Sequence, residues 1–212
     1  MLDSLLQAAA PLLTPLFSLW GSAVTGAELV AFVLSLLMVV ANMRVHPVAW
    51  PLAIISSALY GLLFAHFKLF GEAGLQVVFI VGAFWGWHQW LKGRHDDAKA
   101  LKVSRLSPRQ RLTALLATLA AWPVLAWLLN THTSSDVAWL DALPTVGSLA
   151  GQLLLAQKRI ENWPTWVAVN VVSVALFATK GLWLTVILYS LFTLMALQGW
   201  RAWKRLEGQS HG

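Results

Sequence analysis

Four side chains between positions 163 and 173 could together bind a flat organic molecule. They are two indoles, an amide and a hydroxyl, contributed by Trp163, Trp166, Asn170 and Ser173. At 100° per residue they cover an arc of about 80° on one face of a helix. Indole faces stack on aromatic rings and attract organic cations, and an amide among apolar residues needs a partner. This favours a binding face, with interface anchoring by Trp163 and helix-to-helix bonding by Asn170 as the alternatives.

Six further polar or aromatic residues are weaker candidates for the same site: Gln76, Tyr189, Trp50, Tyr60, Gln152 and Asn42. Gln76 and Tyr189 occupy matching places in two apolar segments, and both can donate and accept hydrogen bonds. Trp50 and Tyr60 could form an aromatic counterpart to the indoles. Hydrogen bonding between helices explains polar groups of this kind equally well.

Catalytic and metal sites find no support in the sequence. Cysteine is absent, and the six histidines show no metal-ligand spacing. No Ser, His and acid combine within the apolar segments, and no glycine-rich phosphate loop occurs. We therefore predict no enzyme, no cofactor and no metal, with an integral-membrane enzyme or assembly factor as the less favoured alternative.

The composition excludes a soluble or disordered chain. Of the 212 residues, 58% are hydrophobic and only 11% are charged, against about 25% charged in a soluble domain. The net charge is +6, but the bases gather in short loops between apolar runs, which indicates membrane orientation and not nucleic-acid binding. The sequence therefore predicts an integral membrane protein embedded in the lipid bilayer.

Long uncharged runs define seven predicted transmembrane helices. A helix needs about 20 residues to cross the hydrocarbon core, and the runs lie near 26–43, 48–66, 72–91, 112–130, 141–157, 163–179 and 181–200. The segment 1–25 contains Pro11 and Pro15 and lacks the basic start of a signal peptide. We expect it to form a short helix on the membrane surface, an eighth span being the other option.

The basic residues predict the direction of the spans. Thirteen of the 15 Lys and Arg residues fall on one side of a seven-span arrangement. Only Lys68 and Lys180 fall on the other. Short loops rich in Lys and Arg stay in the cytoplasm, so the N-terminus should lie outside and the C-terminus inside.

An internal repeat is visible in the sequence. Gly86-Trp87-His88-Gln89-Trp90 resembles Gly199-Trp200-Arg201-Ala202-Trp203, 113 residues later. Earlier in the chain, Trp50 aligns with Trp166 and Ser57 aligns with Ser173 at an offset of 116, which implies a three-residue insertion between the copies. Two three-helix copies with the same orientation need a linking helix, and this 3+1+3 arrangement is typical of transporters with the substrate between the halves.

The repeat also divides the chain into segments. These are an N-terminal surface segment 1–25, a first repeat 26–91, a basic cytoplasmic loop with the linking helix 92–135, a second repeat 136–206 and a cytoplasmic tail 207–212.

The sequence resembles the PnuC-type vitamin transporters over nearly all of residues 26–206. The matching motifs are Glu161-Asn162-Trp163-Pro164-Thr165-Trp166 with Asn170, Lys180-Gly181-Leu182-Trp183-Leu184-Thr185, Tyr189, Gly199-Trp200, Trp50-Pro51-Leu52, Gly74-Leu75-Gln76-Val77 and Gly86-Trp87. The resemblance implies a seven-helix 3+1+3 fold like that of the SWEET transporters.

The same resemblance implies a function. It points to uptake of nicotinamide riboside for NAD biosynthesis through the bacterial inner membrane, by facilitated diffusion with intracellular phosphorylation as the trap. It gives Trp163, Trp166 and Asn170 the contacts to the nicotinamide ring, and makes Gln76 and Tyr189 pocket residues. Related members carry thiamine or riboflavin, which the motif does not separate cleanly, and the implied assembly is a homotrimer.

Overall fold

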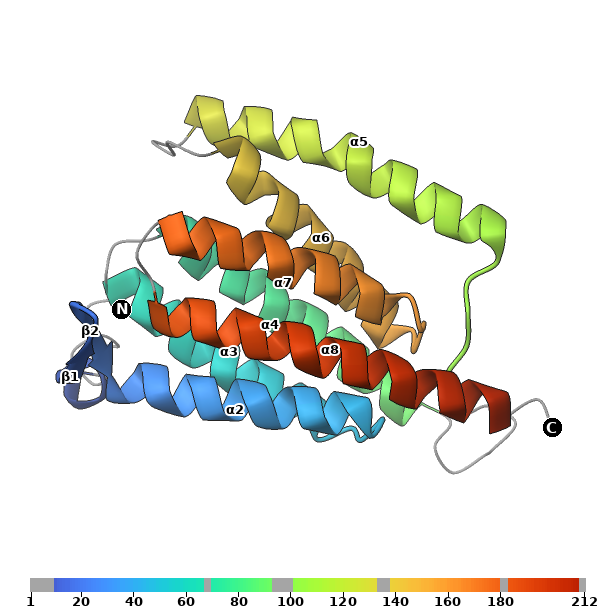
Figure 1. Cartoon of the computed structure of the whole chain (residues 1–212), viewed down its shortest axis with the longest axis horizontal. Coiled ribbons are helices and arrows are strands. Elements are labelled where there is room, and N and C mark those ends of the chain that lie inside the picture. Colours follow the sequence, from blue (N-terminus) through green and yellow to red (C-terminus); the bar gives the residue numbers. More distant parts are fainter. Residues whose placement is uncertain (1–9, 67–69, 93–100, 133–137, 180–182, 210–212) are drawn as a thin grey trace. The chain divides into compact units, whose positions relative to one another are not determined.

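The computed structural model describes residues 10–66, 70–92, 101–132, 138–179 and 183–209. In chain order its elements are β1 (Pro15–Leu19), β2 (Ser22–Thr25), α2 (Gly26–Met43), α3 (Ala49–His66), α4 (Phe70–Leu91), α5 (Pro108–His132), α6 (Ala138–Ala156), α7 (Asn162–Thr179) and α8 (Trp183–Gln209) (Figure 1). The chain divides into two compact units, residues 1–88 and 89–212.

The seven helices α2 to α8 coincide with the seven predicted spans within a few residues, except that α8 continues nine residues beyond its span. By length and composition, three of the described helices can cross a membrane: Gly26–Met43, Pro108–His132 and Trp183–Gly208. A further apolar stretch, Ala49–Leu63, is shorter. The chain is therefore a helical membrane-embedded protein, while the count of seven spans stays a prediction.

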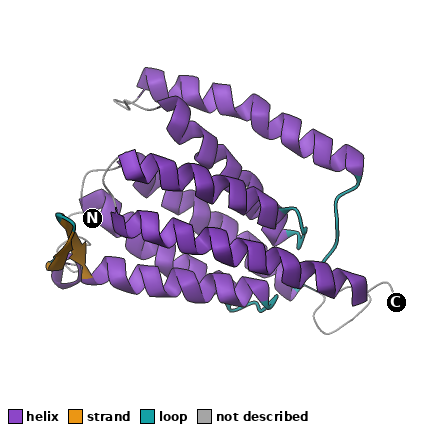
Figure 2. Cartoon of the chain, in the orientation of Figure 1, coloured by secondary structure: helices purple, strands orange, loops and turns teal. Residues whose placement is uncertain are grey.

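The expectation of a surface helix over residues 1–25 is wrong for residues 15–25, which form a β-hairpin, so the chain is not purely α-helical (Figure 2). Residues 1–9 lie outside the described part. Trp20 and Gly21 both have positive φ angles, 47° and 87°. Two such residues form the tight turn that matches the twist of a hairpin. Pro15 lies at the start of its strand, where a missing N–H is tolerated.

In the first unit, the hairpin leads directly into α2. Thr25 caps this helix, because its hydroxyl accepts a hydrogen bond of 3.1 Å from the backbone N–H of Glu28. Leu13, Ala27 and Leu63 form a small buried cluster against which Tyr60 packs. The chain before α2 is thereby held against α2 and α3.

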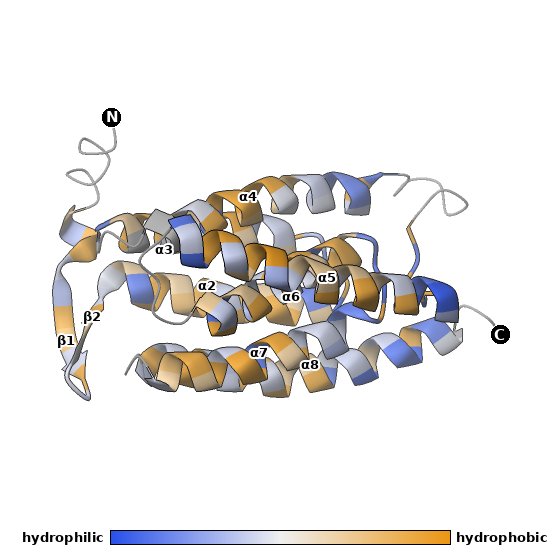
Figure 3. Ribbon diagram, turned by 90° about the horizontal axis from the view of Figure 1, so that it is seen from above, coloured by the Kyte–Doolittle hydropathy of each residue, from blue (hydrophilic) through white to orange (hydrophobic). Residues whose placement is uncertain are grey.

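In the second unit, α6 packs between α5 and α7, and α7 packs against α8. Two glycines of α6, one turn apart, allow α7 to approach closely. A Cβ atom at Gly147 would lie 2.6 Å from Val169, and one at Gly151 would lie 3.0 Å from Trp166. Hydrophilic residues gather at the start of α5 and toward the end of α8 (Figure 3).

The loop before α3 and the loop before α7 have the same structure at an offset of 113 residues. Val45 and Lys158 have φ angles of 53° and 52°. The residue after each of these donates a hydrogen bond of 2.9 Å to a carbonyl five positions back, from His46 to Ala41 and from Arg159 to Leu154. No insertion therefore separates the copies in this region, and the predicted offset of 116 is wrong.

Two tryptophan–glycine contacts confirm the corrected register. A Cβ atom at Gly86 would overlap the indole of Trp50, and one at Gly199 would overlap the indole of Trp163. Trp50 is therefore equivalent to Trp163 and not to Trp166. It follows that Ser57 stands at the position of Asn170, whereas an offset of 116 would have placed Ile54 there. The tight packing of each indole against its glycine determines this alignment of the two copies.

The end of the basic loop, residues 101–107, is fastened to the loop between α6 and α7. Ser104 exchanges backbone hydrogen bonds of 3.1 and 3.0 Å with Lys158 and Ile160. The Lys158 ammonium donates to the carbonyl of Leu101 at 2.8 Å. The Lys158 charge thus holds residues 101–107 in place, in addition to the predicted role of basic residues in orienting the chain in the membrane. We call residues 101–107 the strap.

The strap ends at the first turn of α5. The backbone N–H of Ser107 donates to the Gln110 amide oxygen at 2.9 Å, and the N–H of Gln110 donates to the Ser107 hydroxyl at 3.3 Å. This reciprocal capping box, with Pro108 at the first helical position, explains why α5 begins before the uncharged run does.

Candidate functional site

The predicted face of α7 is turned into the second unit. Trp163, Asn170 and Ser173 are each 3% exposed, and Trp166 is half-buried. Helical periodicity explains the alignment, because the four residues recur at intervals of three or four. The structure therefore brings the predicted indoles, amide and hydroxyl to one buried side of α7.

Trp166 is the indole on this face that lies across a neighbouring helix. Its ring atoms Cε2, Cζ2 and Cδ2 would lie 3.0 to 3.3 Å from a Cβ atom at Gly151 of α6. Gln152, the next residue of α6, is half-buried. Since a glycine offers no side chain, the indole can lie against the α6 backbone, and this holds the ring in a defined position.

Asn170 is a buried amide on the inner face of α7. Among the residues that the structure describes, its side chain has no hydrogen-bond partner. The Asn162 amide nitrogen donates to the carbonyl of Arg159, whereas its Oδ1 atom and the Nε1 atom of Trp163 are buried without a hydrogen-bond partner in the described part of the chain. An amide among apolar residues is favoured when it has a polar partner, so Asn170 is a candidate for a ligand contact.

Trp163 is held by protein packing. Its indole meets the backbone at Gly199 and forms an edge-to-face contact with Trp203, with 5.5 Å between ring centroids. Trp203 is 0% exposed and Trp90 is 3% exposed. The rings of Trp90 and Trp203 are therefore enclosed by protein. Contact of Trp163 with a ligand stays a prediction.

Tyr189 lies in an aromatic group on α7 and α8. Its ring centroid is 5.1 Å from that of Phe177 and 5.8 Å from that of Phe192. The Tyr189 hydroxyl has no hydrogen-bond partner within the described residues. It could therefore bond a ligand.

The first unit contains the four other candidates. Gln76 of α4 packs against α3, where a Cβ atom at Gly61 would lie 3.4 Å from the Gln76 Cβ atom. Tyr60, the residue before Gly61, is half-buried. Asn42 is 5% exposed and Trp50 is 1% exposed. The structure thus places Gln76 against α3 at Gly61 and encloses Trp50 against Gly86.

Sequence reasoning missed the glycines that position these side chains. Gly147 and Gly151 follow the G-x-x-x-G spacing typical of close helix contacts. That spacing could have indicated the α6–α7 contact, and hence the position of Trp166. Within the part of the chain that the structure describes, no group of three His, Asp or Glu side chains could hold a metal ion.

Comparison with known proteins identifies the family. A family model described as nicotinamide mononucleotide transporter matches residues 25–205. The nicotinamide riboside transporter PnuC of Escherichia coli is 29% identical over 174 residues, covering 71% of this chain and 73% of that protein. The riboflavin/roseoflavin transporter RibM of Streptomyces davaonensis is 30% identical over 191 residues, covering 88% of each.

A comparison with solved structures finds a match in the same family. The crystal structure of the vitamin B3 transporter PnuC matches with a TM-score of 0.71 at 25% identity, covering 86% of this chain and 82% of that one. Because the family match extends from the N-cap of α2 into α8 and the fold match accompanies it, the chain belongs to the nicotinamide mononucleotide transporter family.

Proposed function

We propose that this protein takes up nicotinamide riboside through the bacterial inner membrane by facilitated diffusion. The observation that carries the proposal is the buried Asn170 amide without a hydrogen-bond partner in the described chain, one turn from the Trp166 indole. Phosphorylation inside the cell would then trap the vitamin.

The chemistry of the ligand suits this face. Nicotinamide riboside contains a pyridinium cation, a neutral carboxamide and ribose hydroxyls. The Trp166 indole can stack on the cationic ring, and Asn170 can donate to and accept from the carboxamide. Tyr189, in the same unit as Trp166 and Asn170, offers a neutral hydroxyl for the ribose hydroxyls.

The uncharged interior of the spans supports passive transport. Carriers coupled to ions or protons usually place an ionisable group in the middle of the membrane. The uncharged runs of this sequence provide none there. We therefore infer that substrate moves down its own gradient.

We propose a 3+1+3 arrangement, with α5 linking two parallel three-helix halves. The equal structure of the two loops at an offset of 113 supports it. The bases indicate a cytoplasmic C-terminus, and the family resemblance suggests a homotrimer.

Riboflavin is the second candidate substrate. The riboflavin/roseoflavin transporter RibM matches a larger share of this chain than the Escherichia coli PnuC does, at similar identity. Stacking by Trp166 would serve a flavin ring as well. Thiamine, another flat cation, is the third candidate substrate.

A thermal-shift panel with these three vitamins tests the substrate. A ligand at about 100 times its Kd stabilises the folded protein by about 2.7 kcal/mol, so we expect nicotinamide riboside to raise the Tm. A larger shift with riboflavin would transfer the proposal to that vitamin.

Liposomes with purified protein test the mechanism. Labelled nicotinamide riboside should equilibrate across the membrane without a proton or sodium gradient, and protein-free liposomes are the control. Accumulation that requires either gradient would contradict facilitated diffusion.

A further inference from the structure

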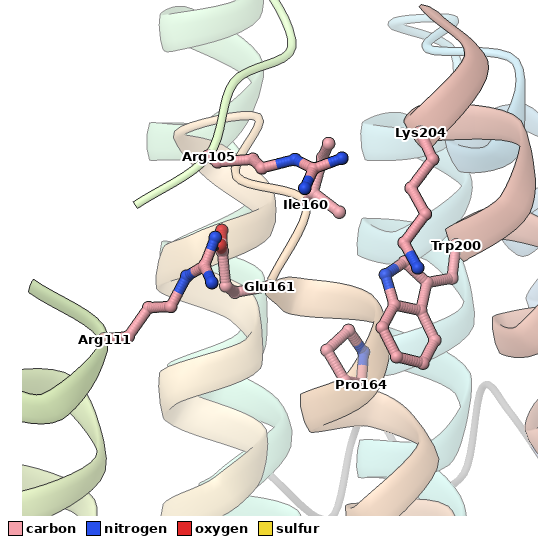
Figure 4. A pocket seen from close by; sticks show the side chains of 7 residues that line it. All are labelled: Arg105, Arg111, Ile160, Glu161, Pro164, Trp200 and Lys204. Carbon is pink, nitrogen blue, oxygen red and sulfur yellow. The ribbon is translucent and has the colours of Figure 1, made fainter. Parts of the chain in front are cut away.

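A pocket of about 340 Å³ lies in the second unit, away from the α7 face that contains Asn170 (Figure 4). The strap contributes Arg105, α5 contributes Arg111, and α8 contributes Trp200 and Lys204. The start of α7 closes it with Pro164. In Figure 4, Arg105 and Lys204 approach the open space above Pro164 from opposite sides.

The pocket lies at the ends of the uncharged runs of three helices, α5, α7 and α8. Arg111 is the last charged residue before the uncharged run of α5, and Glu161 is the last before that of α7. Trp200 ends the uncharged run of α8, and Arg201 follows it. Charged and indole side chains at such boundaries lie at the depth of the lipid headgroups.

The polar side of the pocket favours an anion. Its lining has three cations, Arg105, Arg111 and Lys204, and one carboxylate, Glu161. The Nε atoms of the two arginines donate to Glu207 at 2.6 Å and to Glu161 at 2.8 Å. Each guanidinium has further donors on its terminal nitrogens, a geometry suited to phosphate oxygens.

The remaining lining is apolar. Ile160, Pro164 and the Trp200 ring form this wall, and the Lys204 ammonium lies 4.1 Å from the Trp200 ring centroid. The volume of about 340 Å³ is more than a bare phosphate needs. A ligand with both a phosphate and an apolar part fits better than a free anion.

We propose that this pocket binds the phosphate of an anionic membrane lipid, with the glycerol and the upper acyl chain along Ile160, Pro164 and Trp200. Basic pockets between helices at the membrane surface bind lipid headgroups in this way. A bound lipid would bridge the strap, α7 and α8, and so connect the linking helix to the second repeat. The proposal requires only that the protein is embedded in a bilayer, and it is independent of the transported vitamin.

Native mass spectrometry of the full-length protein in detergent tests the proposal. Phosphatidylglycerol is titrated against phosphatidylcholine, and we expect one phosphatidylglycerol to be retained preferentially. Lys204→Gln should weaken this retention about fivefold, equivalent to about 1 kcal/mol for one basic residue near an anionic lipid. Arg205→Gln is the matched control, because Arg205 is an exposed cation of the same helix and does not line the pocket.

Two outcomes would overturn the proposal. Equal losses for Lys204→Gln and Arg205→Gln would mean diffuse surface attraction and no specific site. Displacement of phosphatidylglycerol by inorganic phosphate as effectively as by glycerophosphate-bearing lipid would identify a soluble anion as the ligand. A thermal melt of both variants confirms that they fold, so a loss of lipid retention can be assigned to the pocket.

Discussion

Trp166 and Trp163 are both indoles on one face of α7, but their surroundings differ. The Trp163 ring is enclosed between Gly199 and Trp203, and its Nε1 atom is buried without a hydrogen-bond partner in the described part of the chain. Trp166 is half-buried and rests on α6 at Gly151. A half-buried ring with one supported side can still offer its other surface to a ligand, which makes Trp166 the better candidate for stacking.

Trp166→Ala should weaken binding of nicotinamide riboside at least about tenfold, since an aromatic or cation–π contact contributes on the order of 1–2 kcal/mol. Titration calorimetry measures the Kd, and Trp166→Phe should retain most of the affinity. Trp127→Ala, at an exposed position of α5, is the control. Unchanged affinity in Trp166→Ala would assign the ring to packing alone.

Gly199→Ala should destabilise the protein by about 1–3 kcal/mol, because the added methyl group overlaps the Trp163 ring. Thermal melts measure the effect. Gly208→Ala on the same helix is the matched control: its Cβ would meet nothing within 4 Å, and alanine favours a helix. Trp163→Phe in the Gly199→Ala background should restore part of the loss; failure of this rescue would contradict the contact.

At the scale of elements, the strap shows how a loop acquires structure from its neighbours. Glu161 accepts a hydrogen bond of 3.2 Å from the backbone N–H of Leu106 and one of 2.8 Å from the Arg111 side chain. The Arg111 side chain is 48% exposed, so that ion pair contributes little stability. The bond from Leu106, which is only partly exposed, matters more.

Glu161→Gln should speed hydrogen exchange of the Leu106 amide about tenfold, because the bond loses its charged acceptor and hydrogen bonds to charged groups contribute about 1.5–3 kcal/mol. Exchange measured by mass spectrometry over residues 101–107 checks this. Glu207→Gln, which removes only the ion pair with Arg105, serves as the control. If both variants exchange equally fast, Glu161 does not hold the strap.

At the scale of the whole molecule, the proposed topology with a cytoplasmic C-terminus rests on the distribution of the basic residues. The hairpin at residues 15–25 would then lie outside, and the end of α8 would lie inside. This arrangement places the basic strap on the side where short basic loops are retained.

The absence of cysteine from the sequence makes the orientation easy to test. Ser18→Cys in β1 and Gly208→Cys in α8 are both at exposed positions. A membrane-impermeant maleimide should label Ser18→Cys in intact cells, and Gly208→Cys only after permeabilisation. The reverse pattern would invert the proposed topology, and the unmodified chain controls for background labelling.

The sequence alone determined the membrane class and most helix boundaries. Charged residues are costly in hydrocarbon, so the uncharged runs had to become the helices, and α2 covers the same residues as its predicted run. The aligned face of α7 followed from helical periodicity, and the membership of the transporter family followed from the motifs that this face contains.

Tertiary structure decided what depends on contacts between distant residues. The register of the repeat was settled by Trp50 against Gly86 and by Trp163 against Gly199, where only a glycine leaves room for an indole. The hairpin at Trp20 and Gly21 and the strap on Glu161 arise from pairing between separate strands and loops. Hydrophobic patterning records how each residue prefers to be buried, but it does not record which distant backbone or side chain will meet it.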